Sequence, residues 1–482
     1  MKIQNYDLVV KGGNLVIPGA GMVKADLAAS GGKIAEIAED IPTQKGANVV
    51  DASGRLVFPG VVDPHFHIGL FRPLRENATS ESRSAASGGI TTLVSYYRTG
   101  INYLNKTGPY REIFPEVLEL SRDSFIVDYA YSLTILTEEQ RNEIEWLVSD
   151  AGVSEFKYFI TFKGTSAITM TDEPVDLGFL YEVMQKIATL NDKYKDYGTI
   201  RLSLHCEEPE IIRVCTRRVR ESGGSGNFSK DYDDSRPGWS EGLAVYEAGI
   251  IAAHTGCPIY LVHLTSREAV DAVRNLSQLY PKLDMTRETT PQHLTLANEN
   301  DYGIWGVVNP PIRSQADVDY LWEALLAGDI DVIGSDHGSL TREQRGKGAT
   351  PSDVTPGFGP APLMLPVMIT EGYHKRGLAL ERIAELISLN PATINNLYPR
   401  KGTIAIGSDA DLAIVDINAE KTVTAATLHS VQDFTPFEGI TLRGWVDTTI
   451  LRGEVIFTNG EIVGKPGYGE YIKRPIKLHQ KA

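Results

Sequence analysis

Cysteine and long apolar runs are both scarce in this sequence, and each scarcity excludes a class of protein. Only three of the 482 residues are cysteines, too few for a disulfide framework in a chain of this size, so we expect a cytoplasmic protein. No stretch reaches the roughly 18 to 20 apolar residues that a membrane-spanning helix needs. The amino-terminal residues also lack the apolar core of a signal peptide. We therefore expect no membrane partner.

Basic residues are in the minority as well. The chain has 47 Lys and Arg against 62 Asp and Glu, a formal net charge of −15, and it contains no basic cluster, which argues against a nucleic-acid partner. Hydrophobic residues make up 42% of the chain and charged residues 23%. This is the composition of a folded globular protein and not of a disordered or fibrous one.

The two ends of the chain share a pattern that the middle lacks. Short alternating apolar runs bounded by Gly and Pro occupy residues 1–60 and return in residues 401–482, which predicts short β-strands. Each set alone would expose an apolar face. We therefore expect both ends together to form one small β-sandwich domain.

Residues 61–400 instead alternate strand-like apolar segments with helical stretches, which predicts βαβ units and a parallel sheet. About 340 residues in eight units suit an α/β fold of the (β/α)₈ type, a TIM-type barrel with some long loops. The alternative is an open doubly wound sheet, which we disfavour because no Gly-rich dinucleotide fingerprint opens a helix. Residues 222–238 are expected to form a surface loop, with a lid over the site as the alternative.

The strongest local motif is DPHFHIG at residues 63–69. His65 and His67 follow an apolar run, and residues two apart on a strand point to the same side, so both imidazoles can reach one metal ion. At the carboxyl end of a barrel strand they would lie where barrel enzymes hold their active sites. Taken alone, such a pair is more often two histidines that merely end a strand than a metal site.

Three further polar residues end apolar, strand-like runs. His205 ends IRLSLH, His263 ends PIYLVH and Asp336 ends DVIGSD. A barrel builds a metal site from the ends of several strands. The sequence therefore predicts that the histidines and the aspartate converge on metal.

Lys157 lies inside the strand-like segment EFKYFI. A buried lysine with no adjacent carboxylate is costly. Its amine therefore either reaches solvent or a distant acid, or it is neutral and combines with carbon dioxide. The resulting carbamate would be an anionic bridge between two metal ions. The sequence alone leaves these alternatives open.

Together these motifs resemble those of the amidohydrolase superfamily, and the similarity covers nearly the whole chain. The HxH pair, the strand lysine, the two single histidines and the aspartate follow in the superfamily's order. The segments EFKYFITFKG, TTPQHLTL, NPPIRS and GSDHGSL resemble those of its cyclic amidases: hydantoinase, dihydropyrimidinase, allantoinase and dihydroorotase.

The resemblance implies a hydrolase that opens the C–N bond of a cyclic amide, imide or ureide, and a homo-oligomer, either dimer or tetramer. Two divalent ions would bind six residues: His65, His67, Lys157, His205, His263 and Asp336. Lys157 would be an N6-carboxylysine that bridges the ions. A hydroxide between them would attack the carbonyl, with Asp336 as the catalytic acid–base. We favour zinc, with manganese and cobalt as alternatives.

Departures from the hydantoinase pattern leave the substrate open. Hydantoinases carry a tyrosine after the carboxylated lysine where this chain has Phe162. Either another group, such as Tyr158 or Tyr97, supplies the hydroxyl, or the substrate differs. Asn309 is closer to the dihydroorotase pattern than to the hydantoinase pattern, and Arg98 lies roughly where dihydroorotases carry an asparagine that binds the substrate carboxylate. The expected substrate contacts are Arg98, Tyr158, Phe162, Asn309 and His337.

The resemblance thus leaves other activities open. They are a dihydroorotase- or allantoinase-like activity and hydrolysis of a linear amide, urea or carbamate. A non-catalytic scaffold is disfavoured, because all six metal positions have competent side chains.

Overall fold

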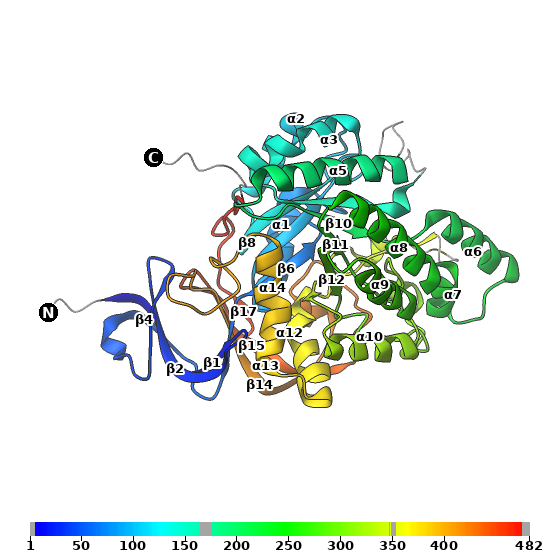
Figure 1. Cartoon of the computed structure of the whole chain (residues 1–482). Coiled ribbons are helices and arrows are strands. Elements are labelled where there is room, and N and C mark those ends of the chain that lie inside the picture. Colours follow the sequence, from blue (N-terminus) through cyan, green and yellow to red (C-terminus); the bar gives the residue numbers. More distant parts are fainter. Residues whose placement is uncertain (1–4, 164–174, 347, 349–352, 475–482) are drawn as a thin grey trace.

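The computed structural model describes residues 5–163, 175–346, 348 and 353–474, and its centre is an eight-stranded parallel sheet in chain order (Figure 1). The strands are β6 Val61–Phe66, β7 Ile90–Tyr97, β8 Asp128–Thr134, β9 Glu155–Phe159, β10 Arg201–His205, β11 Ile259–Leu261, β12 Met285–Thr289 and β13 Val332–Ile333. Phe66 pairs in parallel with His337, just after β13. The His67 amide donates to the His337 carbonyl at 2.9 Å. The first and last strands therefore meet, which confirms the predicted barrel.

The described helices lie between and after the barrel strands, and most of them cover the outside of the barrel (Figure 1). They are α1 Leu74–Ser87, α2 Tyr110–Ser121, α3 Glu138–Trp146, α5 Leu177–Tyr194, α6 Pro209–Ser222, α7 Phe228–Ser235, α8 Gly238–Thr255, α9 Arg267–Leu279, α10 Gln315–Ala327, α11 Arg342–Arg345, α12 Met364–Val367, α13 Leu380–Ala384 and α14 Asn390–Ile394. The expectation of a loop over 222–238 was wrong for its second half. Asn227 caps α7 there by accepting a hydrogen bond from the Lys230 amide.

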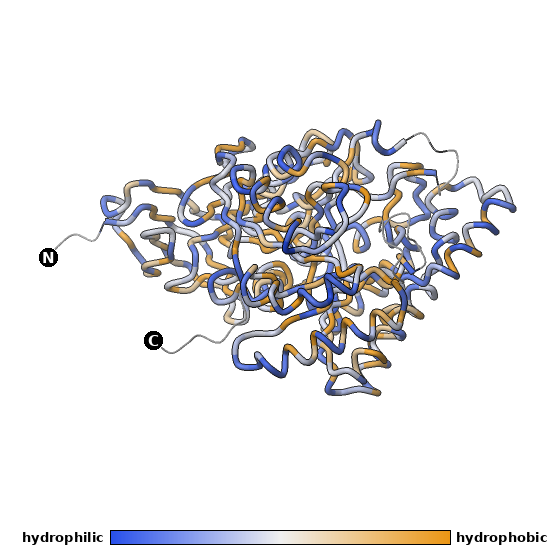
Figure 2. The backbone as a smooth tube through the Cα atoms, turned by 90° about the horizontal axis from the view of Figure 1, so that it is seen from above, coloured by the Kyte–Doolittle hydropathy of each residue, from blue (hydrophilic) through white to orange (hydrophobic). Residues whose placement is uncertain are grey.

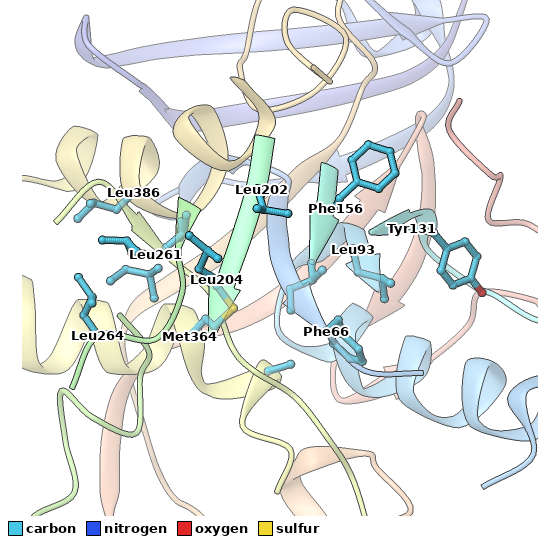
Figure 3. Packing of buried hydrophobic residues seen from close by; sticks show 14 of the residues in the cluster. Phe66, Leu93, Tyr131, Phe156, Leu202, Leu204, Leu261, Leu264, Met364 and Leu386 are labelled. Atoms are coloured by element: carbon cyan, nitrogen blue, oxygen red, sulfur yellow. The ribbon is translucent and has the colours of Figure 1, made fainter. Parts of the chain in front are cut away.

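The alternation of side chains along each barrel strand separates the core from the site. Leu202 and Leu204 of β10 point outward into the apolar layer under the helices (Figure 3), as does Phe156 of β9. The residues between and after them therefore face the barrel interior. By this rule Lys157 and His205 point inward.

A separate, mixed, nine-stranded sheet is built from both ends of the chain, which confirms the prediction of a small second β-domain. Its strands are β1 Tyr6–Ile17, β2 Gly21–Ser30, β3 Lys33–Ala38, β4 Gly46–Asp51, β5 Leu56–Pro59, β14 Leu412–Thr422, β15 Thr441–Leu451, β16 Glu454–Thr458 and β17 Glu461–Ile462. The antiparallel pairing of β5 with β14 joins the two ends. Figure 2 shows hydrophobic and hydrophilic residues alternating along the chain here. The division of the domains at residues 60 and 401 stays a prediction.

A buried ion cluster joins this sheet to the amino-terminal end of the barrel. The Lys401 amine lies 2.6 Å from Asp128 at the start of β8, and 2.9 and 2.7 Å from Asp409 and Asp411 before β14. All four side chains are buried. Because a lysine fills its centre, this acidic group is an ion-pair network and not a metal site. Within the described part of the chain, no helix is both long and apolar enough to cross a membrane.

Candidate metal centre and substrate cavity

The predicted ligands meet at the carboxyl end of the barrel. A cavity of about 520 Å³ is lined by five of them: His65, His67, His205, His263 and Asp336. Lys157, on β9, lies beside it, with its amine 4.4 Å from the centre of the Tyr96 ring. The Tyr96 ring in turn lies 4.5 Å from that of His65. All six residues are thus brought together.

The predicted ligands form two neighbouring groups in this cavity. The Nε2 atoms of His65 and His67 lie 3.2 and 3.1 Å from Asp336 Oδ1, and the donor atoms of the three residues all lie within 4.8 Å. The His205 and His263 rings form a second group, with their centres 4.5 Å apart. The centre of the His263 ring lies 5.3 Å from that of His65, so the two groups of side chains are in direct proximity.

Backbone strain contributes to this convergence. His263 and Asp336 have left-handed φ values of 40° and 53°, which cost a residue other than glycine on the order of 1 kcal/mol. Both follow short barrel strands, β11 and β13, where the chain turns away from the sheet. Strained residues of this kind cluster at functional sites.

The protonation states suit metal binding. Burial lowers the pKa of His65, His205 and His263, so these imidazoles are neutral, which is the form that binds metal. Burial alone would raise the pKa of Asp336, but the neighbouring His65 and His67 lower it to about 2. The aspartate is therefore an anion at neutral pH.

Glu288, on β12, was missed by the sequence analysis. Its Oε1 lies 2.8 Å from His65 Nδ1 and accepts a hydrogen bond from the His263 amide at 2.9 Å. When His65 donates its Nδ1 proton to this carboxylate, its Nε2 presents a lone pair toward Asp336. One acid thus fixes the orientation of a ligand from each group. The one sequence signal for this role of Glu288 is its inward-facing position on β12.

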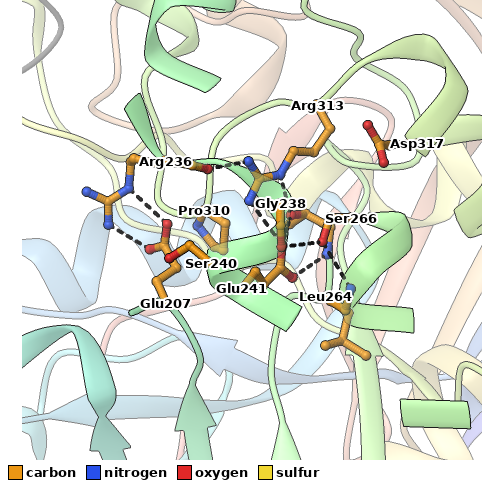
Figure 4. A network of polar contacts seen from close by, with 12 residues as sticks. Glu207, Arg236, Gly238, Ser240, Glu241, Leu264, Ser266, Pro310, Arg313 and Asp317 are labelled. Atoms are coloured by element: carbon orange, nitrogen blue, oxygen red, sulfur yellow. Dashed lines mark hydrogen bonds and ion pairs between the residues drawn. The ribbon is translucent and has the colours of Figure 1, made fainter. Parts of the chain in front are cut away.

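Next to His205 lies an ion pair that the sequence analysis also missed, between Glu207 and Arg236 (Figure 4). The His205 Nε2 lies 2.7 Å from Glu207 Oε2, and Arg236 donates two hydrogen bonds to that carboxylate, at 2.9 and 2.6 Å. Beside this pair, Arg313 donates to Glu241 at 3.0 Å. The network fixes the ring of His205 against the turn that precedes α8.

The Lys157 amine is the clearest unsatisfied group of the site. It is fully buried and has no hydrogen-bond partner among the described residues. Burial lowers its pKa to about 8, although Glu288 and Asp336 counteract this shift. An orphaned buried amine is costly, and a carbamate with its oxygens on metal would remove that cost. The residues present therefore fit a pair of divalent ions.

Three of the five expected substrate contacts line the cavity: Arg98, Phe162 and Asn309. The other two expectations need correction. The Tyr158 hydroxyl donates to the Asp176 carbonyl at 2.7 Å, because Tyr158 alternates with Lys157 and faces outward. His337 is buried against Phe66, with ring centres 4.4 Å apart.

The described remainder of the cavity wall is mostly apolar, with a few polar groups. The lining residues that the sequence analysis did not anticipate include Leu70, Phe71, Tyr103, Thr161, Val308 and Thr355. The Tyr103 hydroxyl lies 3.3 Å from His67 Nδ1. Tyr97, offered above as a source of a hydroxyl, is buried and not among the lining residues.

A parallel barrel with neutral imidazoles, an aspartate and an orphaned lysine at the carboxyl ends of its strands defines a class, the metal-dependent barrel hydrolases. Comparison with known proteins narrows the class. The sequence profile of the amidohydrolase family matches residues 56–456, and the chain belongs to this family. This confirms the family that the motifs predicted.

Its relatives span the whole chain. D-hydantoinase from Geobacillus stearothermophilus is 30% identical over 478 residues, 97% of this chain and 96% of the relative. Allantoinase from Deinococcus radiodurans is 34% identical over 96% of this chain and 98% of the relative. The crystal structure of dihydropyrimidinase from Brevibacillus agri NCHU1002 matches with a TM-score of 0.86 at 25% identity, covering 98% of this chain and 99% of the other.

Proposed function

We propose that this protein opens the C–N amide bond of a cyclic amide, imide or ureide by hydrolysis. The observation that carries the proposal is the convergence of five ligand side chains on one cavity, beside the orphaned amine of Lys157. The cavity, about 520 Å³, suits a small ring. The similarity to D-hydantoinase and allantoinase over almost their full lengths supports the same reaction class.

The proposed cofactor is a pair of divalent ions, with zinc favoured over manganese and cobalt. One ion would bind His65, His67 and Asp336, and the other His205 and His263. Lys157 would bridge them as N6-carboxylysine, because a pKa of about 8 leaves part of the amine neutral and able to add carbon dioxide. When bound, the pair supplies a water of lowered pKa and an electrophile for the carbonyl.

The chain's own residues would then direct the reaction. The Asp336 carboxylate would accept the proton of the attacking water and deliver it to the ring nitrogen as the C–N bond breaks. Phe162 and Phe71, on the cavity wall, would exclude bulk water. Arg98 and Asn309, on the same wall, would orient the polar atoms of the ring.

A substrate panel tests the proposal. Protein reconstituted with zinc or manganese is incubated with hydantoin, dihydrouracil, dihydroorotate, allantoin and a simple imide, with linear amides and ureas as the comparison. Ring opening of at least one cyclic compound, lost in Lys157→Ala together with bound metal, is the expected result. Turnover of linear compounds only, or a variant with both metals and full activity, would contradict it.

We also propose a cytoplasmic homo-oligomer, either a dimer or a tetramer. One face of α8 supports it, because Trp239, Leu243 and Ile250 lie on that face and are 48%, 40% and 42% exposed. A stripe of this kind marks an interface more often than a single exposed residue does. Leu243→Glu should lower the mass measured by light scattering, whereas Leu279→Glu, on α9, should not.

A further inference from the structure

Phe162 leaves the proposed reaction without a hydroxyl donor at the position where the hydantoinases that this chain resembles carry tyrosine. Tyr158 and Tyr97 do not fill the gap, because neither lines the cavity. Among the described residues that line it, Tyr103 is the one tyrosine. It lies in the segment after β7, across the ligand His67 from Asp336.

The hydrogen bonding of His67 decides which way the Tyr103 proton can point. His67 Nε2 faces Asp336 at 3.1 Å, and its Nδ1 lies 3.3 Å from the Tyr103 hydroxyl oxygen. An imidazole that binds metal through Nε2 carries its proton on Nδ1 and donates it. Tyr103 is then the acceptor of this bond. Its own O–H has no other acceptor among the described residues and remains for a group in the cavity.

The backbone around Tyr103 holds the ring in place. Asn102, Tyr103 and Asn105 all have left-handed φ values, 72°, 54° and 52°, and such conformations persist only where their surroundings enforce them. The Gly100 amide closes the loop by donating to the Lys106 carbonyl at 2.7 Å. The hydroxyl is therefore presented from a fixed position, which a preorganised donor requires.

We infer that Tyr103 is a catalytic residue whose hydroxyl donates a hydrogen bond to the carbonyl oxygen of the amide under attack. The inference rests on the proposed function. As water adds to the carbonyl carbon, negative charge develops on that oxygen, and the hydrogen bond strengthens. The proton stays on Tyr103 throughout, so no group has to be regenerated. Tyr103 thus takes over the role that Phe162 cannot play.

Tyr103→Phe tests the inference, with Tyr97→Phe as the matched control. Loss of one such donor lowers kcat by about 100-fold or more, and KM should change by no more than about threefold, because the bond is weak in the ground state. At saturating metal, the metal content measured by mass spectrometry should stay that of the wild type in both variants. Metal affinity measured by calorimetry should stay that of the wild type in Tyr97→Phe and should fall in Tyr103→Phe, because that change also removes the acceptor for His67 Nδ1. Tyr97→Phe should retain wild-type kcat. Phe162→Tyr added to Tyr103→Phe should restore roughly tenfold or more of kcat.

Two outcomes would overturn the inference. Unchanged kcat in Tyr103→Phe would exclude a catalytic hydroxyl. Loss of bound metal in that variant would make Tyr103 only a positioning residue for His67. The wild type on the substrate panel separates this question from the proposed function. If it cleaves linear amides but opens no ring, the proposed function fails, and the comparison of the variants on the linear amide still decides the role of Tyr103.

Discussion

Lys157 should destabilise the metal-free protein, and replacing it by methionine tests this. The amine is fully buried without a hydrogen-bond partner among the described residues, and burial lowers its pKa from 10.5 to about 8. One pKa unit corresponds to about 1.4 kcal/mol. Keeping the cation in the folded state therefore costs about 3 kcal/mol. Lys157→Met has a similar volume and no charge, so metal-free Lys157→Met should be more stable than wild type by up to this amount at pH 7.

The sign of the pH dependence follows from the lowered pKa. Below pH 8 the folded and unfolded chains both carry the cation, so the full cost is present. Between pH 8 and 10.5 the folded state loses its proton first, and the cost disappears. The stability advantage of Lys157→Met should accordingly shrink as the pH rises through this window. In metal-loaded protein the order should reverse, because only the wild type can build the bridge.

Urea unfolding of chelator-treated protein in buffer free of carbon dioxide, at pH 7 and pH 10, measures this difference. Lys401→Met is the matched control. It removes an equally buried lysine, but one whose pKa is raised by Asp411 and Asp128 against the effect of burial, so it should destabilise the protein by about 3 to 5 kcal/mol. A metal-free Lys157→Met that is less stable than wild type at pH 7 would refute the reasoning.

Three further predictions concern groups that hold the site and the barrel. Glu288→Gln replaces the carboxylate that accepts from His65 Nδ1 and should reduce metal affinity about 10- to 100-fold. Calorimetry measures the affinity, and Glu268→Gln on α9 is the control. Arg236→Met leaves Glu207 buried without its cation, so that variant should lose metal preferentially from the half of the site that contains His205, which metal analysis measures. Arg474→Met removes a donor that lies 2.6 Å from Asn395 Oδ1 and should lower the free energy of unfolding by about 1 to 3 kcal/mol; unchanged urea unfolding would contradict this.

The convergence of the proposed ligands on one cavity could be predicted because it depends mostly on local rules. Where an apolar run ends, a barrel strand ends, and residues at that point face a common centre, so His205, His263 and Asp336 could be placed without knowledge of any loop. Lys157 was singled out as a lysine inside a strand-like segment, and its role came from the resemblance. The alternation of neighbouring side chains explains one failure. Asp336 turns into the cavity, so the next residue, His337, turns away and packs on Phe66.

The remaining site residues could not be predicted, because their positions depend on contacts distant in sequence. Glu288 acts on His65 only through the register in which β12 lies among its neighbours. Tyr103 lies on the cavity wall in a loop where it and two nearby residues, Asn102 and Asn105, adopt left-handed backbone, and the segment INYLNKT carries no sequence signal for this conformation. Phe162 was recognised as a departure, but the residue that compensates for it lies on another loop.

The two buried lysines, Lys401 and Lys157, lie toward opposite ends of the barrel and differ in their electrostatic surroundings. Lys401, at the amino-terminal end, is surrounded by three carboxylates, so its charge is satisfied and it stabilises the junction of the two domains. Lys157, near the carboxyl end, has no such partner, so its buried charge lowers the stability of the metal-free fold. A fold selected for stability alone would replace Lys157 by an apolar residue. The cost would be removed if the amine gained partners from outside the chain, which is the chemistry proposed for it.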